Sequence, residues 1–292
     1  MRQTWGGVTG KRLLITGATN GIGLAAATEL SRRGAELTLI ARNPARAEQA
    51  IRQIEGAGSD RTSIDVLIAD LASQASIREL ADQALAKYPT IQVLVNNAGA
   101  VYQRRQLSVE GIELTWAVNH LAPFLLTTLL LDRLKESAPA RIITTSSDAH
   151  RRAHIPFDDL NAERSWGGMG FTRYGETKLA NILFTVELAR RLEGTGVRAN
   201  CFHPGFVATG FNTNNGPLMR IGMLLARPFG RSSAKGAETL VWLADSEDAG
   251  AVSGGYFVDK RQVTSAPATR DPDAARRLWE ISEAQTRATM RR

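Results

Sequence analysis

The chain has few of the residues that would build a metal site or a disulfide framework. Its 292 residues include one cysteine, Cys201, which excludes a disulfide framework and a cysteine-based metal site. Cys201 lies in an apolar run and is expected to be a buried small hydrophobe. His150, His154 and His203 lack the spacing of metal ligands, so we expect no metal site.

Long apolar runs are also scarce. Residues 1–7 contain no apolar core of the length found in a signal peptide. The longest apolar stretch near mid-chain, 121–131, is interrupted by Pro123 and Thr127 and is shorter than the roughly 20 residues that cross a bilayer. We therefore expect no integral membrane segment and a cytoplasmic location.

The net charge of +7 is not gathered into one patch of sequence. The arginines are scattered as pairs, which is typical of solvated helix faces rather than of a surface that follows a nucleic acid. No zinc-finger spacing and no RNA-binding aromatic signature occur, so no nucleic-acid partner is expected. With 43% hydrophobic and 22% charged residues, the chain can bury a large core.

Apolar strand patterns alternate with amphipathic helix patterns along most of the chain. This predicts an α/β fold: one doubly wound Rossmann-type domain over 1–292, with a mostly parallel seven-stranded sheet and helices on both faces. A short N-terminal arm (1–10), a substrate lid (206–230) and a C-terminal tail (261–292), a loop followed by a surface helix, complete it. The expected strands are 12–17, 36–41, 64–69, 91–96, 140–146, 197–202 and 255–258; the expected helices are 22–33, 44–56, 74–87, 108–135, 174–193 and 231–244.

The segment 16–23 joins the first expected strand to the first expected helix. Its sequence is Thr-Gly-Ala-Thr-Asn-Gly-Ile-Gly. Gly17 permits a tight turn, and Gly21 and Gly23 let the backbone approach a pyrophosphate at the positive end of the helix. A dinucleotide-binding loop is therefore predicted here.

Polar residues with acid–base chemistry follow two later strands. Thr145, Ser146 and Ser147 end the strand 140–146, where a hydroxyl can donate to a substrate oxygen. Tyr174 and Lys178 are spaced i, i+4 and share one helix face. An ammonium beside a phenol favours the phenolate, so we expect a lowered Tyr174 pKa and a general acid or base near neutral pH.

Together these motifs resemble the short-chain dehydrogenase/reductase superfamily, and more narrowly its retinol-dehydrogenase-like branch, from about residue 10 to 258. The signature comprises the glycine loop, Asn96-Asn97-Ala98-Gly99, Asn119, Ser147, Tyr174-x-x-x-Lys178 and Pro204-Gly205-x-Val207-x-Thr209. The branch is indicated by Asn119-His120-Leu121, Ser146-Ser147-x-Ala149-His150, Lys178-Leu179-Ala180-Asn181 and His203-Pro204-Gly205.

The resemblance implies hydride transfer between a nicotinamide and a carbonyl or alcohol group. Tyr174 would exchange the proton, Ser147 rather than Ser146 would hold the reacting oxygen, Lys178 would tune Tyr174 and bind ribose, and Asn119 would position a relay water. Thr177 replaces the serine usual before the lysine and keeps its hydroxyl. The expected cofactor-binding residues are Gly17, Thr19, Asn20, Gly21, Ile22, Gly23, Arg42, Asp70, Leu71, Asn97, Ala98, Gly99, Tyr174, Lys178, Pro204, Gly205, Val207 and Thr209.

The end of the second strand bears on cofactor choice. NAD-specific relatives carry an acidic residue there, whereas this chain has Ala41 followed by Arg42. An arginine can pair with a 2′-phosphate, so we expect NADP(H) to be preferred, with NAD(H) as the alternative.

The substrate side leaves several alternatives. The apolar residues of 206–230 predict a lipophilic aldehyde or ketone, although a helix packing on its own domain or on a partner explains them nearly as well. A homodimer through the helix 108–135 is expected by resemblance, and core burial explains that helix equally well. The alternative functions are a non-catalytic dinucleotide sensor or scaffold and, with less support, a nucleotide-sugar epimerase, for which little chain remains after residue 205.

Overall fold

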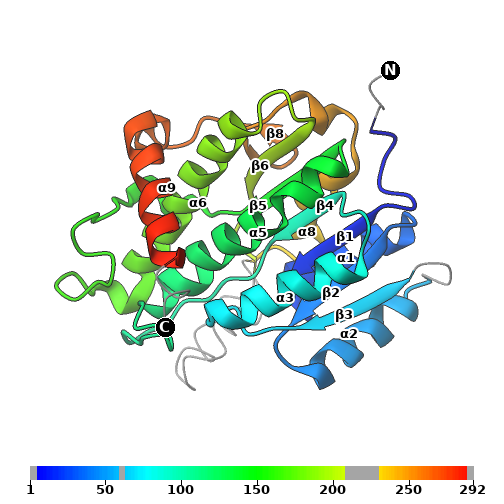
Figure 1. Ribbon diagram of the computed structural model, residues 1–292, viewed down its shortest axis with the longest axis horizontal. Coiled ribbons are helices and arrows are strands. Elements are labelled where there is room, and N and C mark those ends of the chain that lie inside the picture. Colours follow the sequence, from blue (N-terminus) through cyan, green and yellow to red (C-terminus); the bar gives the residue numbers. More distant parts are fainter. Residues whose placement is uncertain (1–4, 59–62, 208–229, 288–292) are drawn as a thin grey trace.

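One eight-stranded sheet crosses the computed structural model, which describes residues 5–58, 63–207 and 230–287 (Figure 1). The strand order is β3-β2-β1-β4-β5-β6-β7-β8. The first seven strands run parallel, as expected, and β8 pairs with β7 antiparallel. The strands are β1 (Arg12–Thr16), β2 (Glu36–Ala41), β3 (Ile64–Ile68), β4 (Val93–Asn96), β5 (Ala140–Thr145), β6 (Val197–His203), β7 (Tyr256–Val258) and β8 (Arg261–Gln262).

The expected count of seven strands missed β8. This strand has two residues, both exposed, so it carries no alternation of apolar and polar side chains that a pattern could reveal. It forms because Asp259 and Lys260 adopt positive φ angles and turn the chain back onto β7.

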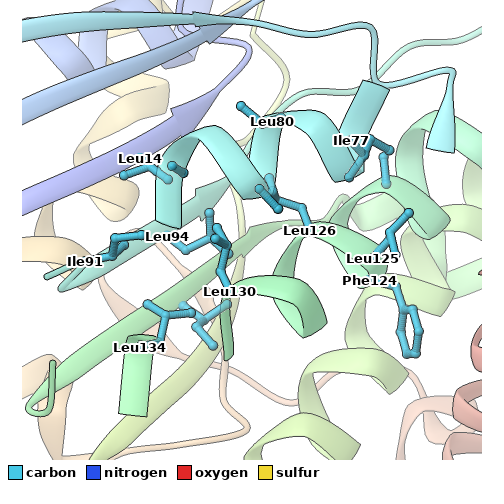
Figure 2. Packing of buried hydrophobic residues seen from close by; sticks show 14 of the residues in the cluster. Leu14, Ile77, Leu80, Ile91, Leu94, Phe124, Leu125, Leu126, Leu130 and Leu134 are labelled. Carbon is cyan, nitrogen blue, oxygen red and sulfur yellow. The ribbon is translucent and has the colours of Figure 1, made fainter. Parts of the chain in front are cut away.

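Helices cover both faces of the sheet because alternate strand residues are apolar on both sides. Leu13 and Ile15 of β1 join one buried cluster, and Leu14 joins the other. In Figure 2, Leu80 and Leu126 gather with Leu14 in this second cluster. The helices are α1 (Gly21–Arg32), α2 (Pro44–Glu55), α3 (Gln74–Lys87), α4 (Leu114–Trp116), α5 (Ala122–Glu136), α6 (Phe171–Arg191), α8 (Ser233–Asp245) and α9 (Pro272–Arg287), with a π-helical turn, η1 (Ala117–Leu121), between α4 and α5.

The helix expected over 108–135 begins later, at Leu114. Residues 107–113 instead form a turn closed by an antiparallel bridge between Leu107 and Glu113, with Gly111 at a positive φ. The helical run Leu114–Glu136 is long and apolar enough to cross a membrane by length and composition alone, yet 72% of its apolar window is buried inside the fold. Core packing accounts for its apolar character.

The C-terminal tail contributes to the core rather than only to the surface. Its helix α9 lies beside α6 (Figure 1). Trp279 of α9 is 5% exposed, and its ring lies 4.9 Å from that of Phe124 and 6.0 Å from that of Phe184. The helix expected in the tail is confirmed, and the burial of Trp279 explains why one face of α9 is apolar.

The strand order reverses between β1 and β4, which are neighbours in the sheet although β2 and β3 come between them in sequence. In a doubly wound sheet the ligand crevice opens at this switch point, outside the carboxyl ends of the strands. The loops after β1, β4, β5 and β6 therefore define the candidate site. The expected lid 206–230 lies largely outside the described residues, and Thr209 lies outside them entirely.

Candidate active site

The glycine loop after β1 forms a cradle that side chains would fill. Gly17 has a φ of +67°, and a Cβ atom there would lie 2.9 Å from the Cα of Ala98. A Cβ on Gly23 would lie 2.2 Å from the Gly17 carbonyl oxygen. Asn20 begins α1 without a side-chain cap, and the first turn carries no acidic residue. The backbone N–H groups of the first turn of α1 thus suit a pyrophosphate. The cradle therefore fits the dinucleotide that the sequence implied.

Asn97, expected to bind the cofactor, holds three strand ends together. Its side-chain Nδ2 donates to the Thr16 carbonyl oxygen at 3.1 Å, and its Oδ1 accepts from the Thr145 hydroxyl at 3.3 Å. The Thr16 hydroxyl accepts from the backbone N–H groups of Asn97 and Ala98. The ends of β1, β4 and β5 are thereby fixed at the crevice.

Asn119 lies in the π-helical turn η1, the kind of local widening that is frequent at functional sites. Its Oδ1 accepts from the N–H of Ala100 at 2.8 Å, and its Nδ2 donates to the Ala100 carbonyl oxygen at 2.9 Å. A Cβ on Gly99 would lie 3.4 Å from both Asn119 Oδ1 and Lys178 Nζ, so these three residues adjoin. The Thr177 hydroxyl accepts from Asn119 Nδ2 at 3.1 Å, which gives its retained hydroxyl a role.

The two neighbouring serines have different partners. Ser146 is buried, and its hydroxyl donates to the backbone carbonyl of Lys178 at 2.8 Å. Ser147 is only partly buried, and its side chain is hydrogen-bonded to the phenol of Tyr174. The geometry therefore places Ser147, the serine chosen from the sequence, beside the expected proton donor.

Tyr174 and Lys178 lie together as their spacing predicted. Lys178 Nζ is 5.3 Å from the centroid of the Tyr174 ring and donates to the Thr145 carbonyl oxygen at 3.0 Å. Burial raises the pKa of Tyr174 to about 12, against the hydrogen bond from Ser147, and burial lowers the pKa of Lys178 to about 8. The shift is opposite to the expected lowering of the Tyr174 pKa, because removing the phenolate from water outweighs the hydrogen bond from Ser147.

The loop after β6 reaches the glycine loop. A Cβ on Gly236 of α8 would lie 2.6 Å from Val207 and 3.3 Å from Ile22, so these expected cofactor residues share one neighbour. Gly205, after Pro204, has a φ of +81° and would meet the side chain of Arg231 if it carried a Cβ. Val207 thus lies beside the cradle, and Gly205 lies beside Arg231.

The expected adenosine end lies at the carboxyl ends of β2 and β3. Arg42 and Asp70 are exposed there, and Leu71 packs against the core. Tyr102, which the sequence did not single out, lies within electrostatic range of both charges. Burial raises the pKa of its phenol, a shift that Arg42 opposes and Asp70 reinforces.

Sequence reasoning missed a buried ion network beside Tyr174. Arg173 donates to Glu113 at 2.8 Å and to Glu176 at 2.9 Å, and it also contacts the carbonyl of Leu160. The i, i+3 spacing of Arg173 and Glu176 could have suggested that pair. Glu113 is 60 residues away in sequence, and no local pattern links it to Arg173.

No metal-binding cluster of three or more ligand residues occurs within the part of the chain that the structure describes. His150 and His203, two of the histidines weighed as ligands, instead hydrogen-bond to backbone. His150 contacts the Ser147 carbonyl and the Ala266 N–H, and His203 contacts the Asp148 N–H.

Comparison with known proteins identifies the family. Residues 11–158 match the short chain dehydrogenase family. Retinol dehydrogenase 14 of Mus musculus is 44% identical over 97% of this chain and 89% of its own length. A Streptomyces sp. (strain C5) protein described as a daunorubicin C-13 ketoreductase is 40% identical over 98% of this chain and 96% of its own.

A solved structure agrees with these sequence matches. A short chain dehydrogenase from Burkholderia cenocepacia J2315, in complex with NADP, has a TM-score of 0.66 and 26% identity, and it covers 86% of this chain and 96% of its own. The chain therefore belongs to the short-chain dehydrogenases, in their retinol-dehydrogenase-like branch, and is an NAD(P)-dependent oxidoreductase.

Proposed function

We propose that the chain reduces a lipophilic aldehyde or ketone with NADPH and that Tyr174 is the general acid. The observation behind this proposal is the partly buried Tyr174, whose phenol is hydrogen-bonded to Ser147 and whose ring centroid lies 5.3 Å from Lys178 Nζ, next to the glycine cradle. A raised phenol pKa keeps the proton on Tyr174 at neutral pH, and a protonated phenol is the form that can donate to a carbonyl oxygen.

The proposed roles follow from position. A reduced nicotinamide, when bound, supplies the hydride that adds to the carbonyl carbon. Ser147 donates a hydrogen bond to the carbonyl oxygen and stabilises the charge that develops on it. Tyr174 transfers its phenolic proton to that oxygen, and an alcohol results. Lys178, in its ammonium form, stabilises the phenolate left on Tyr174. Asn119, which lies beside Lys178, positions the water through which a proton returns.

The preference for NADPH over NADH rests on the end of β2. Ala41 is buried there and carries no carboxylate to bind ribose hydroxyls, whereas Arg42 is exposed beside it. The charge of Arg42 suits a 2′-phosphate. The solved Burkholderia relative holds NADP, which supports this choice of dinucleotide.

The proposal of a lipophilic substrate rests on apolar side chains around the catalytic helix. Phe171, the first residue of α6, is 45% exposed and precedes Tyr174 by one turn. Met169 and Phe206 are 64% and 54% exposed. Exposed apolar groups of this size, two of them within five residues of Tyr174 in sequence and Phe206 in the loop after β6, suit an apolar ligand. The names of the murine and Streptomyces relatives, which refer to retinol and daunorubicin, support bulky substrates.

The test is NADPH oxidation by purified protein with carbonyl compounds graded from polar to lipophilic. Tyr174→Phe should lower kcat by about 10²- to 10⁴-fold while NADPH still binds, because only the proton is lost. Tyr88→Phe, which removes a phenol bonded to Asp65, is the matched control and should leave kcat unchanged. Faster turnover of short polar carbonyls would contradict the lipophilic substrate.

Two other functions predict different results. A non-catalytic sensor would bind NADPH and turn over no carbonyl, and an epimerase would convert a nucleotide sugar without net consumption of cofactor. A single domain, a homodimer and a cytoplasmic location stay predictions, to be checked by limited proteolysis, light scattering and cell fractionation.

A further inference from the structure

The peptide group between Ser147 and Asp148 is held from both sides by imidazoles. Its carbonyl oxygen, on Ser147, lies 2.7 Å from His150 Nδ1. Its N–H, on Asp148, donates to His203 Nδ1 at 3.3 Å. Ser147 is the residue whose side chain bonds the Tyr174 phenol, so the two histidines grip the backbone of a catalytic serine.

The partners of His150 fix which of its nitrogens carries the proton. Its Nε2 accepts from the backbone N–H of Ala266 at 3.1 Å, so Nε2 must be unprotonated. The proton is therefore on Nδ1, from which it is donated to the Ser147 carbonyl. His150 is buried, and its ring packs edge-on against that of Tyr256, with 5.0 Å between the two centroids.

His203 must adopt the opposite tautomer. Its Nδ1 accepts from the Asp148 N–H and so carries no proton, which places the proton of the neutral ring on Nε2. Protonation of His203 breaks its hold on the peptide, because a charged ring cannot accept from the Asp148 N–H. A charged His150 still donates to the Ser147 carbonyl but can no longer accept from the Ala266 N–H, so its ring loses the second contact that fixes it.

We propose that His150 and His203 are positioning residues that clamp the Ser147–Asp148 peptide in opposite neutral tautomers and so aim the Ser147 hydroxyl at Tyr174. The inference rests on the proposed reductase function for its effect on turnover, but the tautomers themselves do not depend on it. Protonation of His203 would release the Asp148 N–H and loosen the hold on Ser147, so the clamp also makes activity sensitive to acid.

The charges that face the two rings are mixed. Asp148 favours and Arg151 disfavours a charged His150. Around His203, Asp148 and Asp259 favour the charged form, whereas Arg231 and His150 disfavour it. Burial has the largest effect on both and lowers both pKa values below the ordinary histidine value, so the clamp is closed at neutral pH. It should open as the pH falls into the acidic range.

The first test is independent of activity. Two-bond ¹⁵N–¹H correlation NMR of histidine-labelled protein distinguishes the tautomers of the four histidines, with signals assigned by single substitutions. At neutral pH we expect the proton of His150 on Nδ1 and that of His203 on Nε2. The same tautomer for both, or a charged ring at neutral pH, would overturn the clamp.

The second test uses paired isosteres at His150. Asparagine can place its Nδ2 where the ring has Nδ1 and keep the bond to Ser147, whereas His150→Gln places its amide nearer the Ala266 contact and loses that bond. We expect His150→Gln to lower kcat by about 10- to 100-fold with KM for NADPH little changed, as misplaced catalytic groups do. His150→Asn should retain most of kcat. The exposed His154, changed to glutamine, is the control and should behave as wild type.

The third test concerns acid sensitivity. His203→Asn keeps an oxygen acceptor for the Asp148 N–H and removes a titrating ring, so the loss of kcat in acid should begin at a lower pH than in wild type. An unchanged acid limb, or equal kcat in His150→Gln and wild type, would overturn the clamp although the reductase function stands. A wild-type protein that turns over no carbonyl contradicts the proposed function instead, and the tautomer measurement then still decides the clamp.

Discussion

Arg173 donates from Nε to Glu113 Oε2 over 2.8 Å, and the two side chains are 2% and 0% exposed. The same guanidinium donates to Glu176, and its carbon lies 4.7 Å from the centre of the Trp116 ring. Because Arg173 immediately precedes Tyr174, this network fixes the first turn of α6 against α4. Tyr174, the proposed general acid, is thus placed by charges that are themselves hidden from water.

Removal of the guanidinium should destabilise the fold. Arg173→Met leaves two buried carboxyl groups without their cation, a change that typically costs about 3–5 kcal/mol of unfolding free energy. Urea denaturation followed by circular dichroism measures it. Lys135→Met breaks an exposed i, i+3 pair with Asp132 and should cost less than about 1 kcal/mol. Equal losses in the two variants would show that the buried network adds no more stability than an exposed ion pair.

The lowered pKa of Lys178 leads to a prediction about how the stability of the fold depends on pH. Burial lowers its pKa from 10.5 to about 8, so between these values the unfolded chain binds more protons than the native one. Stability that depends on Lys178 should therefore rise with pH across this window, and below pH 8 the cost of the buried charge is present in full.

Comparison with Lys178→Met isolates this effect, because all other groups titrate in both proteins. Urea denaturation without added nucleotide measures the unfolding free energy of both proteins. Between pH 7 and pH 11, the value for wild type should increase by about 3 kcal/mol relative to that for the variant. A difference that stays constant over this range would mean that Lys178 titrates normally in the native protein.

The sequence predicted the parts of the site that reside in local patterns. The glycine loop, the i, i+4 pair Tyr174 and Lys178, and the seven parallel strands each depend on residues close together in sequence, and the structure contains all of them. The direction of the Tyr174 pKa shift was not predictable, because it depends on burial by the whole fold. The ion pair between Arg173 and Glu113 could not be predicted for a similar reason, since only tertiary packing joins the two residues.

Arg42 should decide cofactor preference. Arg42→Ala removes the cation proposed to meet the 2′-phosphate, and the loss of a charged hydrogen bond should raise KM for NADPH by about 10- to 100-fold. KM for NADH should change little, since NADH has no phosphate there. Arg46→Ala removes another exposed arginine, from α2 and four residues on, and serves as the control. Parallel changes for both cofactors, or a similar effect in both variants, would contradict the assignment.

Two glycines beside the cofactor cradle should respond differently to the same added methyl group. A Cβ on Gly23 would lie 2.2 Å from the Gly17 carbonyl oxygen and 2.6 Å from Asn97 Nδ2, whereas a Cβ on Gly99 would meet nothing closer than 3.4 Å. Gly23→Ala must therefore displace backbone and should cost about 1–3 kcal/mol or more in urea denaturation. Gly99→Ala should be neutral or slightly stabilising, because it fits and restricts the unfolded chain. If both variants unfold at the same urea concentration, the close packing of Gly23 behind the phosphate loop is not what stabilises the cradle.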